Sequence, residues 1–299
     1  MIVAVGERVA VVPGGVNVGV LRGDHDRLVL VDTGINETAA KKALKAAREE
    51  VGGEVVAILT THGHADHFGG NHAIVRRTDA RVYAPEFDEI FLRHPLLQPA
   101  LLFGGADPVD SMRGGFMLAK PSPVDEVVKP GPLVVEGLEI EVVPLAGHSP
   151  GQVGYLVDGV FFCADVVLPE AVLEKYKIPY LFSLTNHLWA LDVAGSVPYT
   201  TAVPGHGPVV DDLSGLIDRN QATINAVQSL ILQVTAQPSG AGTIMTAVLA
   251  HFEHQATDAP SFYLLQPTIA AFLAHLHRME RVTLTIAGNQ ALWTAVAGS

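Results

Sequence analysis

The segment from Thr61 to His67 constrains this chain more than any other. It reads Thr-His-Gly-His-Ala-Asp-His and places four ligand-type side chains within six residues: His62, His64, Asp66 and His67. Imidazole and carboxylate groups together suit zinc, iron or manganese, and a histidine-rich set favours zinc. A catalytic metal needs about three protein ligands and one open position for water. Four ligands are too many for one such site and too few for two, so a two-metal site requires further ligands downstream.

Further ligand-type residues follow apolar runs in the same way. Ligand sites gather at the carboxyl ends of strands, because loops there emerge from a rigid scaffold. His148, Asp165 and His206 are the downstream candidates, and we expect five strands to end at one shared site. The runs are Leu28–Val31 into Asp32, Val55–Thr61 into His62, Ile140–Leu145 into His148, Val160–Cys163 into Asp165, and Thr200–Val203 into His206.

The first two-thirds of the chain alternates short strand-like runs with turns and helical stretches. Asn36 is predicted to cap a helix over Glu37–Val51, with Ala39, Leu44 and Ala47 on its apolar face. Another helix is expected near His72–Thr78. The predicted strands are Glu7–Val12, Val16–Leu21, Arg27–Val31 and Val55–Thr60, followed by hairpins over Pro130–Val143 and Gln152–Cys163 that turn at Glu136-Gly137 and Asp158-Gly159.

After Gly207 the pattern becomes mainly helical. A domain boundary is therefore predicted at residue 210, with a C-terminal domain over 211–299. Helices followed by a terminal hairpin resemble a winged helix. The expected helices are Leu213–Val234, Thr243–Phe252 and Gln266–Met279, and the expected hairpin joins Arg281–Ile286 to Gln290–Ala295.

Taken in order, these motifs resemble those of the metallo-β-lactamase superfamily over roughly residues 8 to 210. The resemblance implies an α/β protein, a four-layer αββα sandwich over residues 1–210 with a small, mostly helical C-terminal domain. The matching motifs are Val31-Asp32-Thr33-Gly34, the His-x-His-x-Asp-His of 62–67, Gly147-His148-Ser149-Pro150-Gly151, Ala164-Asp165, and Pro204-Gly205-His206-Gly207.

The resemblance also implies a ligand assignment for two Zn²⁺ ions, with iron or manganese as alternatives at either site. Asp165 would bridge the two ions, and Asp32 would orient the ligand loop from behind. Ions about 3.5–4 Å apart lower the pKa of a shared water, so a bridging hydroxide would attack the substrate carbonyl. Asp66 and Asp32 are the expected catalytic side chains. One ion would be held by His62, His64 and His148, and the other by Asp66, His67 and His206.

Single positions narrow the class of hydrolase. His67 fits glyoxalase II-like thioesterases, lactonases, processing nucleases and a smaller β-lactamase class. Flavodiiron proteins usually carry a glutamate at the second ligand position, so His64 argues against that class. An acyl-bond hydrolase acting on thioesters or on esters, lactones included, is therefore predicted. The alternatives are a phosphodiesterase or nuclease, a mononuclear iron persulfide dioxygenase, and a metal-bearing binding protein without catalysis.

Three residues downstream of Asp165 are candidates for substrate binding: Tyr176, Lys177 and His187. Glyoxalase II enzymes hold glutathione with a lysine and a tyrosine in a similar stretch, although the spacing here differs. The segment 84–130 is rich in Phe, Leu and Met and poor in charge, which predicts a lid-like insertion forming an apolar wall over the metals.

Charge and composition limit the partners. The formal net charge is −12, and from residue 178 onward the chain has no lysine and only three arginines, which argues against nucleic acid. A small-molecule substrate is expected, and the C-terminal region is predicted to form a homodimer interface or one wall of the pocket. No apolar stretch reaches membrane-spanning length, so no membrane contact is expected. The single cysteine, Cys163, indicates a reducing compartment and hence the cytoplasm.

Overall fold

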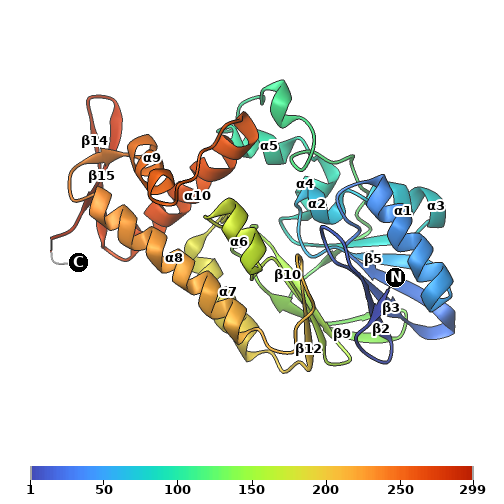
Figure 1. Cartoon of the computed structure of the whole chain (residues 1–299). Helices are drawn as coiled ribbons and strands as arrows, with labels where there is room; N and C mark the ends of the chain where they lie inside the picture. Colours follow the sequence, from blue (N-terminus) through green and yellow to red (C-terminus); the bar gives the residue numbers. More distant parts are fainter. Residues whose placement is uncertain (1, 298–299) are drawn as a thin grey trace.

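Two mixed sheets lie face to face in the computed structural model, which describes residues 2–297 (Figure 1). The first sheet has the order β1-β2-β3-β4-β5-β6-β7. Its strands are antiparallel from β1 to β4 and parallel from β4 to β7. The strands are β1 (Val3–Ala4), β2 (Val9–Val12), β3 (Val18–Arg22), β4 (Arg27–Val31), β5 (Glu54–Leu59), β6 (Arg81–Pro85) and β7 (Glu126–Val128).

The second sheet has the order β12-β11-β10-β9-β8. Both predicted hairpins are confirmed here, with their turns at Glu136-Gly137 and Asp158-Gly159. Only β12 runs parallel to its neighbour. The strands are β8 (Gly131–Val135), β9 (Leu138–Pro144), β10 (Val153–Val157), β11 (Val160–Ala164) and β12 (Thr201–Pro204).

Successive side chains of each strand point to opposite faces of its sheet, and together they fill three apolar layers. In β4, Val29 and Val31 face the second sheet, while Leu28 and Leu30 face the helices outside the first sheet. In β11, Phe162 faces inward to the other sheet and its neighbours face outward. Because successive strand residues point to opposite faces, a strand buried on both sides is apolar throughout. The cores therefore define a sandwich of two sheets between outer helices.

Helices cover both outer faces and confirm the αββα architecture (Figure 1). On the first sheet, α1 (Glu37–Ala46) continues as a π-helical turn, η2 (Ala47–Val51), and lies beside α3 (Asn71–Thr78). The Asn36 side chain accepts hydrogen bonds from two backbone N–H groups and caps α1 as predicted. On the second sheet lie α7 (Leu184–Ser196) and α8 (Ser214–Val234).

Residues 86–125, between β6 and β7, form most of the predicted lid. They contain α4 (Glu89–Arg93), α5 (Leu97–Leu102) and the 3₁₀ turn η3 (Asp110–Met112). Leu102, Met112 and Met117 of this segment pack against residues at the start of the last helix, so the lid rests on the C-terminal region. Two short helices lie in the ligand loops: α2 (Ala65–Phe68) follows β5, and α6 (Glu170–Tyr176) follows β11.

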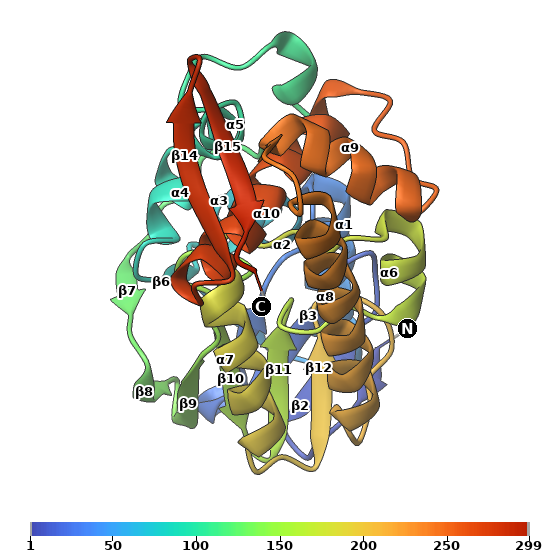
Figure 2. The same cartoon turned by 90° about the vertical axis from the view of Figure 1, so that its left-hand side faces the viewer.

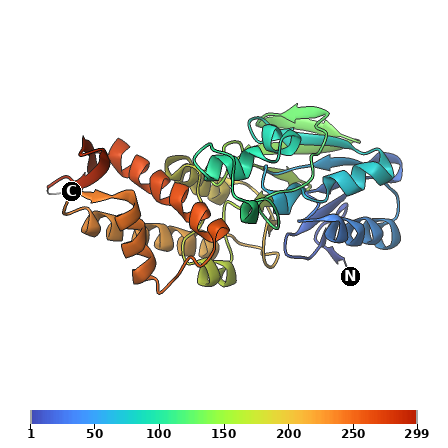
Figure 3. The same cartoon turned by 90° about the horizontal axis from the view of Figure 1, so that it is seen from above.

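The C-terminal region consists of three helices and a small sheet at one end of the molecule (Figures 2 and 3). After α8 come β13 (Ser239–Gly240), α9 (Ala241–His251), α10 (Ala259–Arg278), β14 (Val282–Ala287) and β15 (Gln290–Ala295). The sheet order is β13-β15-β14. One continuous core joins Phe272 of α10 and Ile231 of α8 to Phe161 and Cys163 of the second sheet. The predicted division at residue 210 therefore crosses a shared apolar core, and it stays a prediction.

Two local predictions were wrong. The last helix begins at Ala259 rather than Gln266, because the Asp258 side chain caps it and Pro260 is tolerated in its first turn, while Pro267 lies inside it. On α1 and η2, Leu44 and Ala47 are buried as predicted, but Ala39 is only partly buried, and Ala40 and Ala43 face the core in its place. Within residues 2–297, the helices are too short or too polar to cross a membrane.

The shared core predicts a stability effect. Replacing Phe272, which is fully buried in α10, with alanine should lower the free energy of unfolding by about 3–5 kcal/mol, because it leaves a cavity in the apolar core that the helices share with the second sheet. Urea denaturation followed by circular dichroism measures this. Ile286→Ala on β14, where the side chain is 70% exposed, is the control and should change stability by less than about 0.5 kcal/mol. A Phe272→Ala protein as stable as the control would contradict the shared core.

Candidate metal centre

Five strands deliver their following residues to one edge of the sandwich. Asp32 follows β4, Asp165 follows β11, and His206 lies two residues after β12. The loop after β5 carries the histidine-rich motif, and the loop after β9 carries His148. All seven predicted metal ligands come together here, in three groups whose ligand atoms lie within 4.8 Å of one another: His62, His64 and His148; His62, His67 and Asp165; and Asp66, His67 and His206.

The first group consists of three imidazoles. Nδ1 of His64 lies 3.0 Å from Nε2 of His62 and 2.9 Å from Nε2 of His148. The other nitrogen of His148 donates to the carbonyl of Tyr180. In His62, the other nitrogen lies 3.1 Å from the hydroxyl of Thr61, which itself donates to Asp32. These bonds fix the tautomers, so the Nε2 lone pairs of His62 and His148 point at a common centre.

The second group mixes imidazole with carboxylate. Nε2 of His206 lies 3.5 Å from Oδ2 of Asp66, and its Nδ1 donates to the carbonyl of Gly15. His67 is fully buried, and its Nδ1 donates to Asp32 at 2.8 Å. As in the first group, a hydrogen bond behind each ring leaves its Nε2 facing the shared space.

Asp165 lies between the two groups. Its Oδ1 is 3.4 Å from Nε2 of His67. Its Oδ2 is 3.4 Å from Nε2 of His148 and 3.3 Å from Nε2 of His206. Ala164 adopts a left-handed φ of 50°, next to an irregularity in the pairing of β11 with β12, and this bend aims the following carboxylate at the histidines.

The residues present fit a metal. Zinc ligands at bond lengths of about 2.0–2.1 Å occupy the corners of a tetrahedron whose edges are about 3.3 Å, close to the spacings around Asp165. Moreover, Nε2 of His67 and Oδ1 of Asp165 are buried without a hydrogen-bond partner. Buried polar atoms are rarely left unpaired, and a coordinated cation is the partner that these two lack.

Charge divides the cluster into two halves. Burial lowers the pKa of His64 to about 4 and that of His148 to about 3, so the first group is neutral. Burial also acts to lower the pKa of His206, but the carboxylate of Asp165 outweighs it and raises that pKa to about 9. In the metal-free chain, therefore, the second half binds protons where a cation would otherwise offset the carboxylates.

Asp32 stands behind both halves. Its Oδ1 accepts the N–H of Thr61, and its Oδ2 accepts the hydroxyl of Thr61 and the Nδ1–H of His67, all at 2.8 Å. Its backbone adopts a left-handed φ of 58°, which aspartate tolerates better than most residues. The predicted role of Asp32 in orienting the ligand loop agrees with these contacts.

Three residues that were not predicted from the sequence support the cluster. The ring of Tyr180 packs edge-on against His64 and His148. Asn17 donates to the carbonyls of Pro204 and Gly207 and so holds the His206 loop. Asp88 contacts two ligand loops, and its place after β6 was the available signal: it lies beyond an apolar strand, as the predicted ligands do.

The predicted substrate residues are placed differently. His187 is buried behind Gly147, with its Nδ1 unpartnered, and burial lowers its pKa to about 3. Tyr176 is 44% exposed, and Nζ of Lys175 lies over its ring. Neither Tyr176 nor Lys177 belongs to the three ligand groups, and both lie at the end of α6. The roles of these three residues stay predictions.

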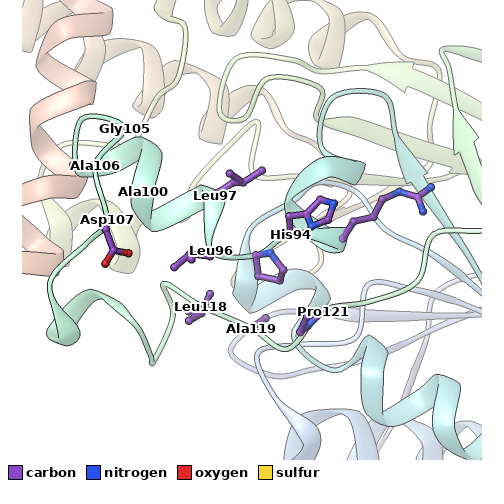
Figure 4. Close-up of a pocket in the computed structure, with 12 residues that line it drawn as sticks. His94, Leu96, Leu97, Ala100, Gly105, Ala106, Asp107, Leu118, Ala119 and Pro121 are labelled. Atoms are coloured by element: carbon purple, nitrogen blue, oxygen red, sulfur yellow. The ribbon is translucent and has the colours of Figure 1, made fainter.

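A pocket of about 580 Å³ lies in the lid (Figure 4). Leu96, Leu97 and Ala100 line it from one side, and Leu118 and Pro121 from the other. Its lining includes none of the predicted ligands, and Gln98 of α5 is hydrogen-bonded to Tyr180 beside the cluster. The lid therefore contains a largely apolar pocket that is separate from the ligand cluster.

Comparison with known proteins agrees with this geometry. Residues 11–206 match the family described as the metallo-beta-lactamase superfamily. A hydroxyacylglutathione hydrolase of Mesorhizobium japonicum is 26% identical over 205 residues, covering 66% of this chain and 69% of that protein. An atrochrysone carboxyl ACP thioesterase of Aspergillus fumigatus is 23% identical over 287 residues, covering 92% of this chain and 59% of that protein. Against two other hydroxyacylglutathione hydrolases, the chain spans 35% and 50% of their length.

Solved structures show the same fold. A beta-lactamase domain protein from Burkholderia ambifaria superposes with a TM-score of 0.79 at 21% identity, over 99% of this chain and 94% of that one. A metallo-beta-lactamase family protein from Thermus thermophilus superposes with a TM-score of 0.75 at 22% identity, over 96% of this chain and 98% of that one. The chain belongs to the metallo-beta-lactamase superfamily. Several of the relatives that it matches in sequence are named as hydrolases.

Asn17 provides a test of how the His206 loop is held. Asn17→Ala removes the donor for two carbonyls at a site that is 6% exposed, so the free energy of unfolding should fall by about 1–3 kcal/mol. Asn225→Ala on the exposed side of α8 is the matched control and should change it by less than about 0.5 kcal/mol. Thermal denaturation of both metal-free variants makes the comparison. Equal stability of the two would show that the loop does not depend on Asn17.

Proposed function

We propose that this protein is a binuclear zinc-dependent hydrolase of acyl bonds, with thioesters and esters, including lactones, as substrates. The observation that carries the proposal is the position of Asp165. One of its oxygens faces His67, and the other faces His148 and His206 at similar distances, so a single carboxylate is shared by both halves of the cluster. A carboxylate shared between two sets of ligands suits a pair of ions held close together.

When bound, the two ions would supply Lewis acidity that activates water and polarises the scissile carbonyl. The chain's own residues set the conditions for that chemistry. Asp66 and Asp165 place two negative charges beside the imidazoles and offset part of the cationic charge. Asp32 holds the His67 ring through Nδ1 and thereby keeps Nε2 directed into the site. Asp66 and Asp32 are therefore the side chains that we expect mutation to show as essential.

The protonation that each leaving group needs favours a thioester as the substrate. A thiolate leaves with little protonation, whereas an amine or alkoxide needs a proton donor. The hydroxyl of Tyr180, beside His64 and His148, is hydrogen-bonded to Gln98, and burial raises its pKa, so it stays protonated at neutral pH. It is the group that we assign to assist an alkoxide, so that esters and lactones remain substrates. The names of the Mesorhizobium and Aspergillus relatives, a hydroxyacylglutathione hydrolase and an ACP thioesterase, support the same class.

The surface around the lid suggests an apolar acyl group. Phe87, Ile90, Leu97 and Leu101 are all more than 40% exposed in this segment. Such exposure on one segment is typical of a surface that contacts a ligand. His187 behind the His148 loop, and Tyr176 with Lys177 at the end of α6, remain our candidates for contacts with the rest of the substrate.

Metal content and substrate choice test the proposal together. Reconstituted wild-type protein should bind close to two zinc equivalents and should hydrolyse acyl thioesters fastest in a panel that also contains lactones, a cephalosporin and a bis-phosphodiester. His67→Ala should lose at least about 100-fold in kcat/KM, since it removes a ligand and the Asp32 contact. Elemental analysis and steady-state assays give both readouts.

The control for this experiment is His72→Ala, on α3 near the motif but outside the ligand groups, which should retain wild-type turnover. One metal equivalent with a preference for iron would favour a persulfide dioxygenase. Hydrolysis of the phosphodiester alone would favour a nuclease. Wild-type turnover by His67→Ala would overturn the two-metal mechanism.

The C-terminal region resembles a winged helix, because it has three helices and a hairpin that pairs with β13. We propose that this region packs against the rest of the chain or forms a dimer interface, and that it does not bind nucleic acid. Its charges support this. Beyond residue 178 the only basic side chains apart from histidine are Arg219, Arg278 and Arg281. Arg219 is paired with Glu170, and Arg278 donates to the hydroxyl of Thr185. Phosphate contacts supply most non-specific affinity for nucleic acid, and each needs a basic group.

Full-length protein should therefore show no binding to duplex DNA or RNA at physiological salt. A gel-shift titration at two salt concentrations measures this, with a basic DNA-binding protein as the positive control. Binding tighter than about micromolar that weakens steeply with salt, as counterion release demands, would contradict the role proposed for the region.

A further inference from the structure

Asp88 joins two loops that lie far apart in sequence. It is fully buried beyond the end of β6. Its Oδ1 accepts the N–H of Gly63 at 2.9 Å. Its Oδ2 accepts the hydroxyl of Ser149 at 3.0 Å and the N–H of Gly151 at 2.5 Å. Three hydrogen bonds to a carboxylate offset the cost of burying its charge.

The two loops approach Asp88 closely because each has a glycine at the contact. A Cβ at Gly63 would lie 2.9 Å from the carbonyl oxygen of Asp88, and a Cβ at Gly151 would overlap the carbonyl oxygen of Glu86. Any larger residue would push the turn away. The glycines within the His-Gly-His and Ser-Pro-Gly sequences thus make room for this carboxylate.

The turn that carries Asp88 is itself strained. Phe87 has a φ of 72° although it is a bulky residue, and its side chain is 61% exposed. Backbone strain of this kind persists where the surroundings enforce it. The hydrogen bonds of Asp88 to both loops begin at the next residue of this turn.

These two loops carry one half of the metal cluster. The loop at Gly63 bears His62 and His64, and the loop at Ser149 bears His148. The second group is held differently: His67 by Asp32, and the His206 loop by Asn17. Asp88 therefore bears on the spacing of the first three histidines, since the three hydrogen bonds of its side chain go to the loops that bear them.

We propose that Asp88 is a positioning residue that sets the metal affinity of the His62, His64 and His148 group. This inference rests on the metal centre of the proposed function. Asp88 acts by fixing the separation of the two loops, so that His64 stays within 3.0 Å of His62 and 2.9 Å of His148. Without the hydrogen bonds of Asp88, the two loops move apart and the ligand nitrogens of the three histidines no longer face one common centre.

Asp88→Asn in the full chain tests the proposal. Asparagine has the same shape, but its NH₂ cannot accept an N–H, so one of the loops loses its partner. Metal-free protein is titrated with Co²⁺, whose visible spectrum reports ligand geometry, and zinc affinity is measured by competition with a chelator. One of the two equivalents should bind about 10–100-fold more weakly, and the other should be unchanged.

Three further variants locate the effect. Ser149→Ala removes one hydrogen bond and leaves the carboxylate, so it should weaken the same equivalent by a smaller factor, and it decides the question if Asp88→Asn fails to fold. In a His148→Ala background, which disables the first group, Asp88→Asn should change the remaining equivalent no further. Asp125→Asn makes the same change in a carboxylate that accepts the N–H of Val82 in β6, away from the ligand loops, and should bind both equivalents as wild type does.

The outcomes separate the inference from the proposed function. If wild-type protein binds two equivalents and both Asp88→Asn and Ser149→Ala match it, or if the two equivalents weaken alike, Asp88 does not position the first group and the proposed function stands. If wild-type protein binds no metal, the proposed function fails and this inference fails with it.

Discussion

The apolar layer between the two sheets is the constraint on which the site depends. Val29 and Val31 from one sheet meet Phe162 and Val203 from the other, and this contact holds the carboxyl ends of both sets of strands at one edge. The ligands come from both sheets, so their separation is set by the thickness of this layer. Close packing in such a core tolerates little change in spacing, which is why loops from β5, β9, β11 and β12 can place nitrogen and oxygen atoms within about 3–3.5 Å of one another.

Buried polar side chains then complete the arrangement that the core begins. Asp32, Asn17 and Asp88 are each nearly inaccessible, and each accepts or donates hydrogen bonds to a ligand loop. Asp88 joins the loops that bear the neutral histidines, and Asn17 holds the His206 loop. Asp32 contacts both halves, the first through Thr61 and the second through His67. Occupancy by a cation would satisfy the unpaired atoms of His67 and Asp165 in the centre.

The C-terminal region extends the second sheet's outer core and also supports the lid. Tyr263 at the start of α10 packs against Phe103 beside α5, and both belong to the same apolar cluster as Tyr180, which packs on the histidines. The lid, the last helix and the metal cluster thus form a chain of contacts. A change in the C-terminal helices can therefore reach the site through packing, without any residue of theirs acting as a ligand.

The sequence by itself determined the candidate ligands and the strands that present them. Local patterns carry that information: apolar runs mark strands, and the residue after each run lies at the strand's carboxyl end, so Asp32, His148, Asp165 and His206 could be named from their positions alone. The roles of the supporting residues could not be predicted in this way. Asp88 follows an apolar strand as the ligands do, but its role comes from partners 25 and 63 positions away, and Tyr180 likewise acts on histidines from distant loops. Only the tertiary structure decided those contacts, since loop separation, tautomer and burial are set by packing between segments that the chain brings together on folding.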